Sequence, residues 1–112
     1  MLKITNNNIT LTRGDTAVLT LTVTDSAGDT YDYSNDLTQL TVKRNTVTED
    51  IVLQKTFNGT SITINPEDTK DLHYQDMKYD VQLITSSGAV YTVIPPHDFI
   101  ISDEVSFNVQ YT

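Results

Sequence analysis

The stretch Ile9-Thr-Leu-Thr-Arg-Gly-Asp-Thr-Ala-Val-Leu-Thr-Leu-Thr-Val-Thr24 decides the fold class of this chain. It contains two runs in which apolar residues alternate with threonine, and Arg13–Thr16 joins them. Alternation with period two gives a strand one buried face and one wet face. The stretch therefore predicts a pair of half-buried strands of the antiparallel type.

The rest of the chain repeats this pattern in short runs that are separated by turn residues. Further strands are expected at 31–33, 37–44, 51–57, 61–64, 78–85, 89–94, 98–102 and 105–111. Asn58-Gly59 is the strongest hairpin signal, and Pro95-Pro96 is expected to end a strand. Asn65 and Pro66 favour the start of a short helical turn.

These elements predict one all-β domain over residues 1–112, an antiparallel Ig-like β-sandwich of about eight short strands with one short helical turn. The alternation also predicts which side chains face inward between the two sheets. The expected core residues are Leu19, Leu21, Leu40, Val42, Ile62, Ile64, Val81 and Leu83.

Charge and composition exclude several classes of function. The 15 acidic and 7 basic residues give a net charge of −8, and no basic cluster is larger than Lys43-Arg44, which argues against nucleic-acid binding. The absence of cysteine excludes disulfides and thiolate metal sites. No apolar run approaches the ~20 residues that cross a bilayer. Met1–Ile4 is followed by the polar residues 5–8 and not by the apolar core of a signal peptide. We expect synthesis in the cytoplasm and no membrane contact.

No residue pattern indicates a metal site. His73 and His97 lie far apart and lack the HxxxH or HExxH spacing of zinc ligands. One loop region is rich in aspartate, but its spacing does not match a calcium loop, and aspartate is an ordinary turn residue. These aspartates are Asp25, Asp29, Asp32 and Asp36. We expect no metal and no cofactor.

Two further patterns also have ordinary explanations. Arg13-Gly14-Asp15 spells an integrin-binding tripeptide, but it stands between two strands where glycine and aspartate commonly form turns. Glu67 and Asp68 are adjacent acids, which do not face each other on a helical turn and which suit the start of a helix. We expect the protein not to be an enzyme.

The order of short motifs along the chain carries a family resemblance. The motifs are Ile9–Thr16, Asp25–Gly28, Tyr31–Ser34, Leu40–Lys43, Lys55, Ser61–Ile64, Pro66–Thr69, Tyr79–Leu83, Gly88–Thr92 and Phe99. Together they resemble the N-terminal domain of the baseplate upper protein of phages that infect Gram-positive bacteria, and related prophage tail proteins. The resemblance spans residues 8 to 102.

The resemblance implies a β-sandwich that attaches a tail-fibre or receptor-binding assembly to the phage tail. It implies a virion protein, made in the host cytoplasm, whose partners are other tail or baseplate proteins, and it brings no catalytic residues. Members of that family continue into a long helical stalk, which these 112 residues do not include.

The alternative function is a carbohydrate- or host-surface-binding module. Tyrosine suits such a role because its ring is amphipathic. The available tyrosines are Tyr31, Tyr33, Tyr74, Tyr79, Tyr91 and Tyr111.

The C-terminal run 105–111 has two interpretations. Its apolar face consists of Val105, Phe107, Val109 and Tyr111. The run either completes the sandwich or serves as an assembly strand that pairs with a neighbouring sheet edge, including that of a second copy.

Overall fold

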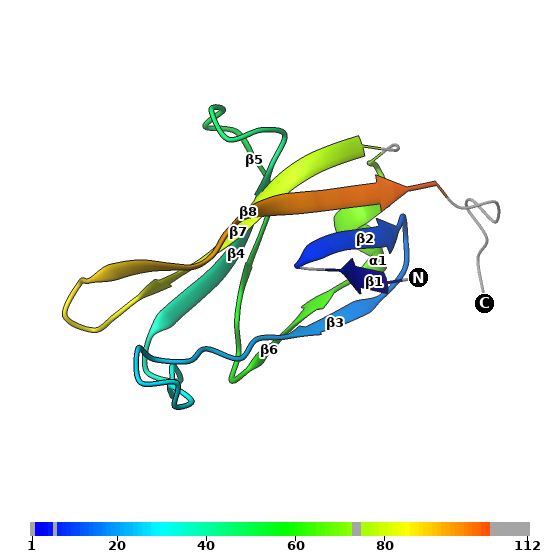
Figure 1. Cartoon of the computed structure of the whole chain (residues 1–112). Coiled ribbons are helices and arrows are strands. Elements are labelled where there is room, and N and C mark those ends of the chain that lie inside the picture. The colour runs from blue at the N-terminus through cyan, green and yellow to red at the C-terminus, as the bar shows by residue number, and fades with distance from the viewer. Residues whose placement is uncertain (1, 6, 73–74, 104–112) are drawn as a thin grey trace.

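The protein is an all-β sandwich in which a large sheet covers a small one (Figure 1). The computed structural model describes residues 2–5, 7–72 and 75–103. The large sheet has six strands in the order β1-β2-β8-β7-β4-β5, and the small sheet has two, β3-β6. The elements are β1 (Leu2–Thr5), β2 (Asn8–Thr12), β3 (Ala17–Thr20), β4 (Leu37–Lys43), β5 (Ile51–Thr56), β6 (Ser61–Ile64), α1 (Pro66–Thr69), β7 (Gln75–Ile84) and β8 (Val90–Ser102).

The core lies between the two sheets, as the alternating pattern predicts. All eight residues expected in the core are buried, and Leu40, Val42, Ile64, Val81 and Leu83 are at most 2% exposed. The same layer includes side chains from β2 and β8 that the expected set omits, among them Leu11, Phe99 and Ile101. The all-β sandwich with one helical turn is therefore confirmed.

The two strands of the stretch Ile9–Thr24, β2 and β3, do not pair with each other, contrary to the prediction. β2 pairs antiparallel with β1 and parallel with β8, whereas β3 pairs with β6 in the other sheet. The connection at Arg13–Thr16 crosses between layers, where Gly14 has φ +81° and its N–H donates to Thr69 Oγ1 at 2.8 Å. The large sheet is consequently mixed. Period-two alternation identifies the buried face of a strand but not its partner.

Asn58-Gly59 forms the expected tight turn but not the expected hairpin. The Asn58 N–H donates to the Ser61 carbonyl at 3.0 Å, and Gly59 has φ +65°. The strands on either side of this turn belong to different sheets, since β5 pairs with β4 and β6 pairs with β3. Turn residues set a local chain reversal and leave open which strands then pair.

Pro95 and Pro96 do not end a strand; they lie inside β8, which continues to Ser102. Tyr79 pairs with His97 and Val81 pairs with Ile94, so the two prolines oppose the single residue Asp80. Such a two-against-one bulge tolerates proline because the extra residue is not needed for the hydrogen-bond ladder.

The expected short strand at 31–33 is likewise absent. The Tyr31 N–H donates to the Val23 carbonyl at 2.8 Å, and a single bridge joins Thr24 to Thr30. A loop therefore takes the place of the expected strand.

Candidate functional site

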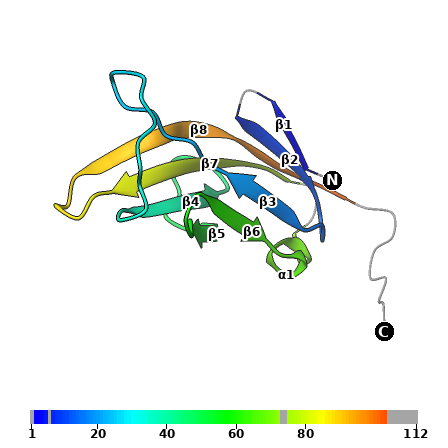
Figure 2. The same ribbon diagram turned by 90° about the horizontal axis from the view of Figure 1, so that it is seen from below.

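The β7–β8 hairpin is longer than the layer that covers it. β3 and β6 have four residues each, whereas β7 has 10 and β8 has 13. Both views show the free end of the hairpin extending beyond β3 and β6 (Figures 1 and 2). In Figure 2 the loop that follows β3 stands beside this end. The inner face of the large sheet is thus left uncovered by the small sheet at one end.

A hollow of about 650 Å³ occupies this end of the sandwich. We call it the tyrosine hollow, because Tyr31 projects from the loop after β3 and Tyr91 from β8. Its other lining residues are Thr22, Val23, Thr24, Asp25, Ser26, Leu83, Thr85, Thr92 and Val93. The hollow combines two aromatic rings, aliphatic side chains and several hydroxyl groups.

Hydrogen bonds hold the loop wall of the tyrosine hollow in place. Asp25 Oδ1 accepts the N–H groups of Ala27 and Asp29, both at 3.0 Å. The Tyr31 hydroxyl donates to Asp36 Oδ2 at 2.5 Å. This hydrogen bond is the main cause of a raised pKa for Tyr31, with smaller contributions from burial and from the charges of Asp36, Asp32 and Tyr91. These hydrogen bonds join residues of the loop to one another, so the loop wall of the tyrosine hollow is held by its own contacts.

The aspartates of this loop serve as hydrogen-bond acceptors in turns. Asp32 Oδ1 accepts the Ser34 N–H at 3.0 Å, and hydrogen bonding from Ser34 lowers the pKa of Asp32. Across the described residues, no cluster of three or more histidine, aspartate or glutamate side chains has the arrangement of a metal site. His97 lies with Nδ1 2.5 Å from the Pro95 carbonyl, and His73 is outside the described residues.

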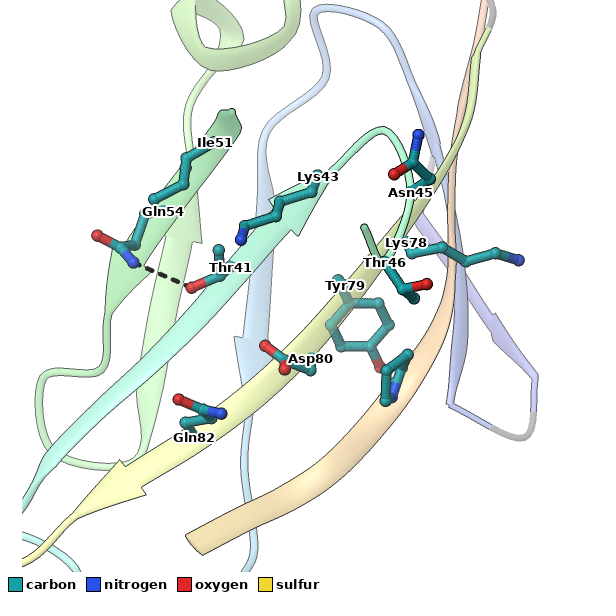
Figure 3. A pocket seen from close by; sticks show the side chains of 11 residues that line it. Thr41, Lys43, Asn45, Thr46, Ile51, Gln54, Lys78, Tyr79, Asp80 and Gln82 are labelled. Carbon is teal, nitrogen blue, oxygen red and sulfur yellow. Dashed lines mark hydrogen bonds between the residues drawn. The ribbon is translucent and has the colours of Figure 1, made fainter. Parts of the chain in front are cut away.

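A second hollow, of about 300 Å³, lies on the outer face of the large sheet and is polar (Figure 3). Figure 3 shows Thr41 and Gln54 on neighbouring strands, and the Gln54 amide donates to the Thr41 hydroxyl at 3.0 Å. Burial raises the pKa of Asp80, while the charge of Lys43 acts in the opposite direction. Lys78 forms an ion pair with Asp98 on the adjacent strand. These features are typical of a solvated sheet face.

The outer face becomes apolar at the free end of the hairpin. Leu37 pairs with Ile84 and Ile84 pairs with Val90, so the three side chains form one row across β4, β7 and β8. Leu37 is 45% exposed and Val90 is 55% exposed. The adjacent row is polar, with Gln39 opposite Gln82. We call Leu37, Ile84 and Val90 the apolar row.

The structure separates the tyrosines proposed for carbohydrate binding. Tyr33 and Tyr79 are buried, and their hydroxyls donate to the carbonyls of Leu21 at 2.6 Å and Asn7 at 2.5 Å. Only Tyr31 and Tyr91, among the described tyrosines, line the tyrosine hollow. Tyr74 and Tyr111 lie outside the described residues, as does the whole run Val105, Phe107, Val109 and Tyr111.

Arg13 has a structural position that the sequence did not indicate. Its side chain is 7% exposed, and Nη1 donates to the Leu72 carbonyl at 3.4 Å and lies 3.8 Å from Asp103 Oδ1. Its N–H donates to the Ser102 carbonyl at 2.8 Å. Arg13 thereby ties the connection after β2 to the end of β8, and its side chain is buried.

Of the adjacent acids Glu67 and Asp68, Asp68 contacts residues outside the pair. Asp68 Oδ2 lies 2.7 Å from Lys55 Nζ and accepts the Asn65 N–H at 2.8 Å. These contacts stabilise the start of α1 and fix it to β5.

Among the described residues, no helix has the length and apolar character that crossing a membrane requires. No family model matches the chain, and neither a curated protein nor a solved structure matches it.

Proposed function

We propose that this chain is a non-enzymatic structural protein of a phage or prophage tail or baseplate, and that it acts by attaching to other tail proteins. The observation that carries the proposal is the apolar row on the outer face of the large sheet. Leu37 and Val90 each expose about half of their surface there, at 45% and 55%. Contiguous apolar side chains on a solvent face favour a partner that covers them.

The surroundings of the apolar row fit a protein contact. Gln39, Gln82 and Thr92 form the next row of the same face, and the Gln82 amide donates to Thr92 Oγ1 at 3.4 Å. An apolar centre beside a polar border is the usual composition of a protein–protein interface. The ordered series of motifs that resembles the phage baseplate domain supports a tail as the setting.

That the run 105–111 forms a second contact with a neighbouring subunit remains a prediction. Deleting residues 104–112 distinguishes its two interpretations. An assembly strand predicts a folded, monomeric truncated protein and an intact chain that self-associates. A core strand instead predicts that the truncated protein unfolds or loses several kcal/mol of stability.

The test of the proposed function is the composition of tailed particles purified from the organism that encodes the chain. We expect mass spectrometry to detect the chain in those particles, and gold-labelled antibody to mark one position on the tail. Detection of the chain only in the particle-free fraction would contradict the proposal.

A further inference from the structure

We propose that the tyrosine hollow is a binding site for a neutral pyranose sugar. This inference goes beyond attachment in a tail, and it rests on the uncovered end of the sandwich. The hollow measures about 650 Å³, which lies within the range of about 300–1,000 Å³ for small-molecule sites.

The two tyrosine rings supply surfaces on which a sugar ring packs. Tyr91 is 57% exposed and Tyr31 is 36% exposed, and the two rings come from different segments of the chain. The face of an aromatic ring carries negative charge density, which attracts the polarised C–H groups on one face of a pyranose. Val23 and Val93 add aliphatic contact beside the rings.

The same hollow also offers partners for sugar hydroxyls. Thr22, Thr24 and Ser26 line the loop side. Thr85 lines the hairpin side, where its hydroxyl already accepts the Ala89 N–H at 3.1 Å and contacts Ser87 Oγ at 2.9 Å. Each hydroxyl can donate one hydrogen bond and accept two. The combination of aromatic, aliphatic and hydroxyl groups in the lining therefore matches a pyranose, which has both apolar C–H groups and hydroxyls.

The charge near the hollow selects a neutral sugar. Asp25 lines it, and Asp36 holds the hydroxyl of Tyr31. With a net charge of −8 on the whole chain, a sialic or uronic acid would meet repulsion.

The site is largely formed before any ligand binds. The Asp36 acceptor fixes the Tyr31 hydroxyl, and Tyr91 is placed by pairing with Leu83 on β7. A pre-organised site loses less conformational entropy on binding.

The experiment is an amide NMR titration of the full chain with glucose, galactose, rhamnose and N-acetylglucosamine, each at millimolar concentrations, and with N-acetylneuraminic acid as the anionic comparison. We expect at least one neutral sugar to shift the signals of residues 22–31 and 91–93 in a saturable manner, with the acid binding more weakly. No saturable shift there with any of the four neutral sugars would overturn the proposal.

Substitutions then assign the binding to the tyrosines. Tyr91→Ser should weaken the affinity about tenfold or more, while Tyr31→Phe, which keeps the ring, should have a smaller effect. Val18→Ser is the matched control, because Val18 is 58% exposed on β3 and does not line the hollow. Equal affinity in Tyr91→Ser and Val18→Ser, with both amide spectra showing the native fold, would also overturn the proposal. These measurements use the isolated chain, so their failure is separate from a failure of tail attachment.

Discussion

Leu83 and Tyr91 pair directly across the β7–β8 hairpin and share one face of the large sheet, yet Leu83 is 2% exposed and Tyr91 is 57% exposed. This difference in exposure marks the place where the small sheet stops covering the large sheet. Leu83 belongs to the core between the sheets and forms part of the lining of the tyrosine hollow, whereas Tyr91 lines the hollow without belonging to the core. One strand pair thus contributes both to stability and to a candidate binding surface.

The first prediction concerns the core. Leu21 is 7% exposed, so Leu21→Ala should lower the free energy of unfolding by about 2–5 kcal/mol, since it removes buried methyl groups and leaves a cavity. Val47→Ala is the control, because Val47 is 87% exposed and should change stability by about 0.5 kcal/mol or less. Urea denaturation measures both, and equal small effects would refute the assigned core.

The second prediction compares two tyrosine hydroxyls. Tyr33 is buried and donates to the Leu21 carbonyl, so Tyr33→Phe leaves that acceptor unpaired and should cost about 1–3 kcal/mol. Tyr31→Phe removes a hydroxyl whose bond to Asp36 is exposed, and should cost about 0.5 kcal/mol or less. Denaturation midpoints of the two variants test the ranking, and a reversed order would contradict the assigned bonds.

The third prediction concerns the pH dependence of stability. Burial alone would raise the pKa of Asp68, but hydrogen bonds from Lys55 and from the Asn65 N–H, with the Lys55 charge, lower it overall from 3.8. Its contribution to stability is therefore present above pH 3.8 and is lost as the pH falls through the depressed pKa. Asp68→Asn should destabilise the protein at neutral pH, and the difference from the wild type should shrink in acid.

Asp80 should show the opposite pH dependence of stability. Burial raises its pKa above 3.8, with Lys43 opposing, so the folded state loses stability as the pH rises through that raised value. Relative to the wild type, Asp80→Asn should gain stability as the pH rises through this range. Thermal melts of both variants across acid and neutral pH measure the two slopes, and slopes of the same sign would contradict the assignment.

The sequence predicted which faces of the strands are buried better than it predicted which strands pair. Alternation placed Leu19, Ile62 and Val81 in the core because side-chain direction follows the local backbone. It could not place β2 beside β8, since Ile9 and Phe99 are distant in sequence and meet through tertiary packing.

The candidate site depended even more on long-range contacts. Tyr31 and Tyr91 are separated by about half of the chain, and no local pattern indicates that they line one hollow. The burial of Arg13 is similar, because its partners Leu72 and Asp103 are distant in sequence. The apolar row was partly visible in the sequence, because Leu37 and Val90 lie at or next to the first residue of the expected strands 37–44 and 89–94.

Attachment through the apolar row can be tested by complementation of tailed particles that are assembled without this chain. The double variant Leu37→Thr/Val90→Thr keeps strand-forming side chains and removes apolar surface. We expect it to fold but to be missing from purified particles, while the wild type and the control Val18→Thr are both incorporated. Incorporation of the double variant at the wild-type level would show that the apolar row is not the attachment surface.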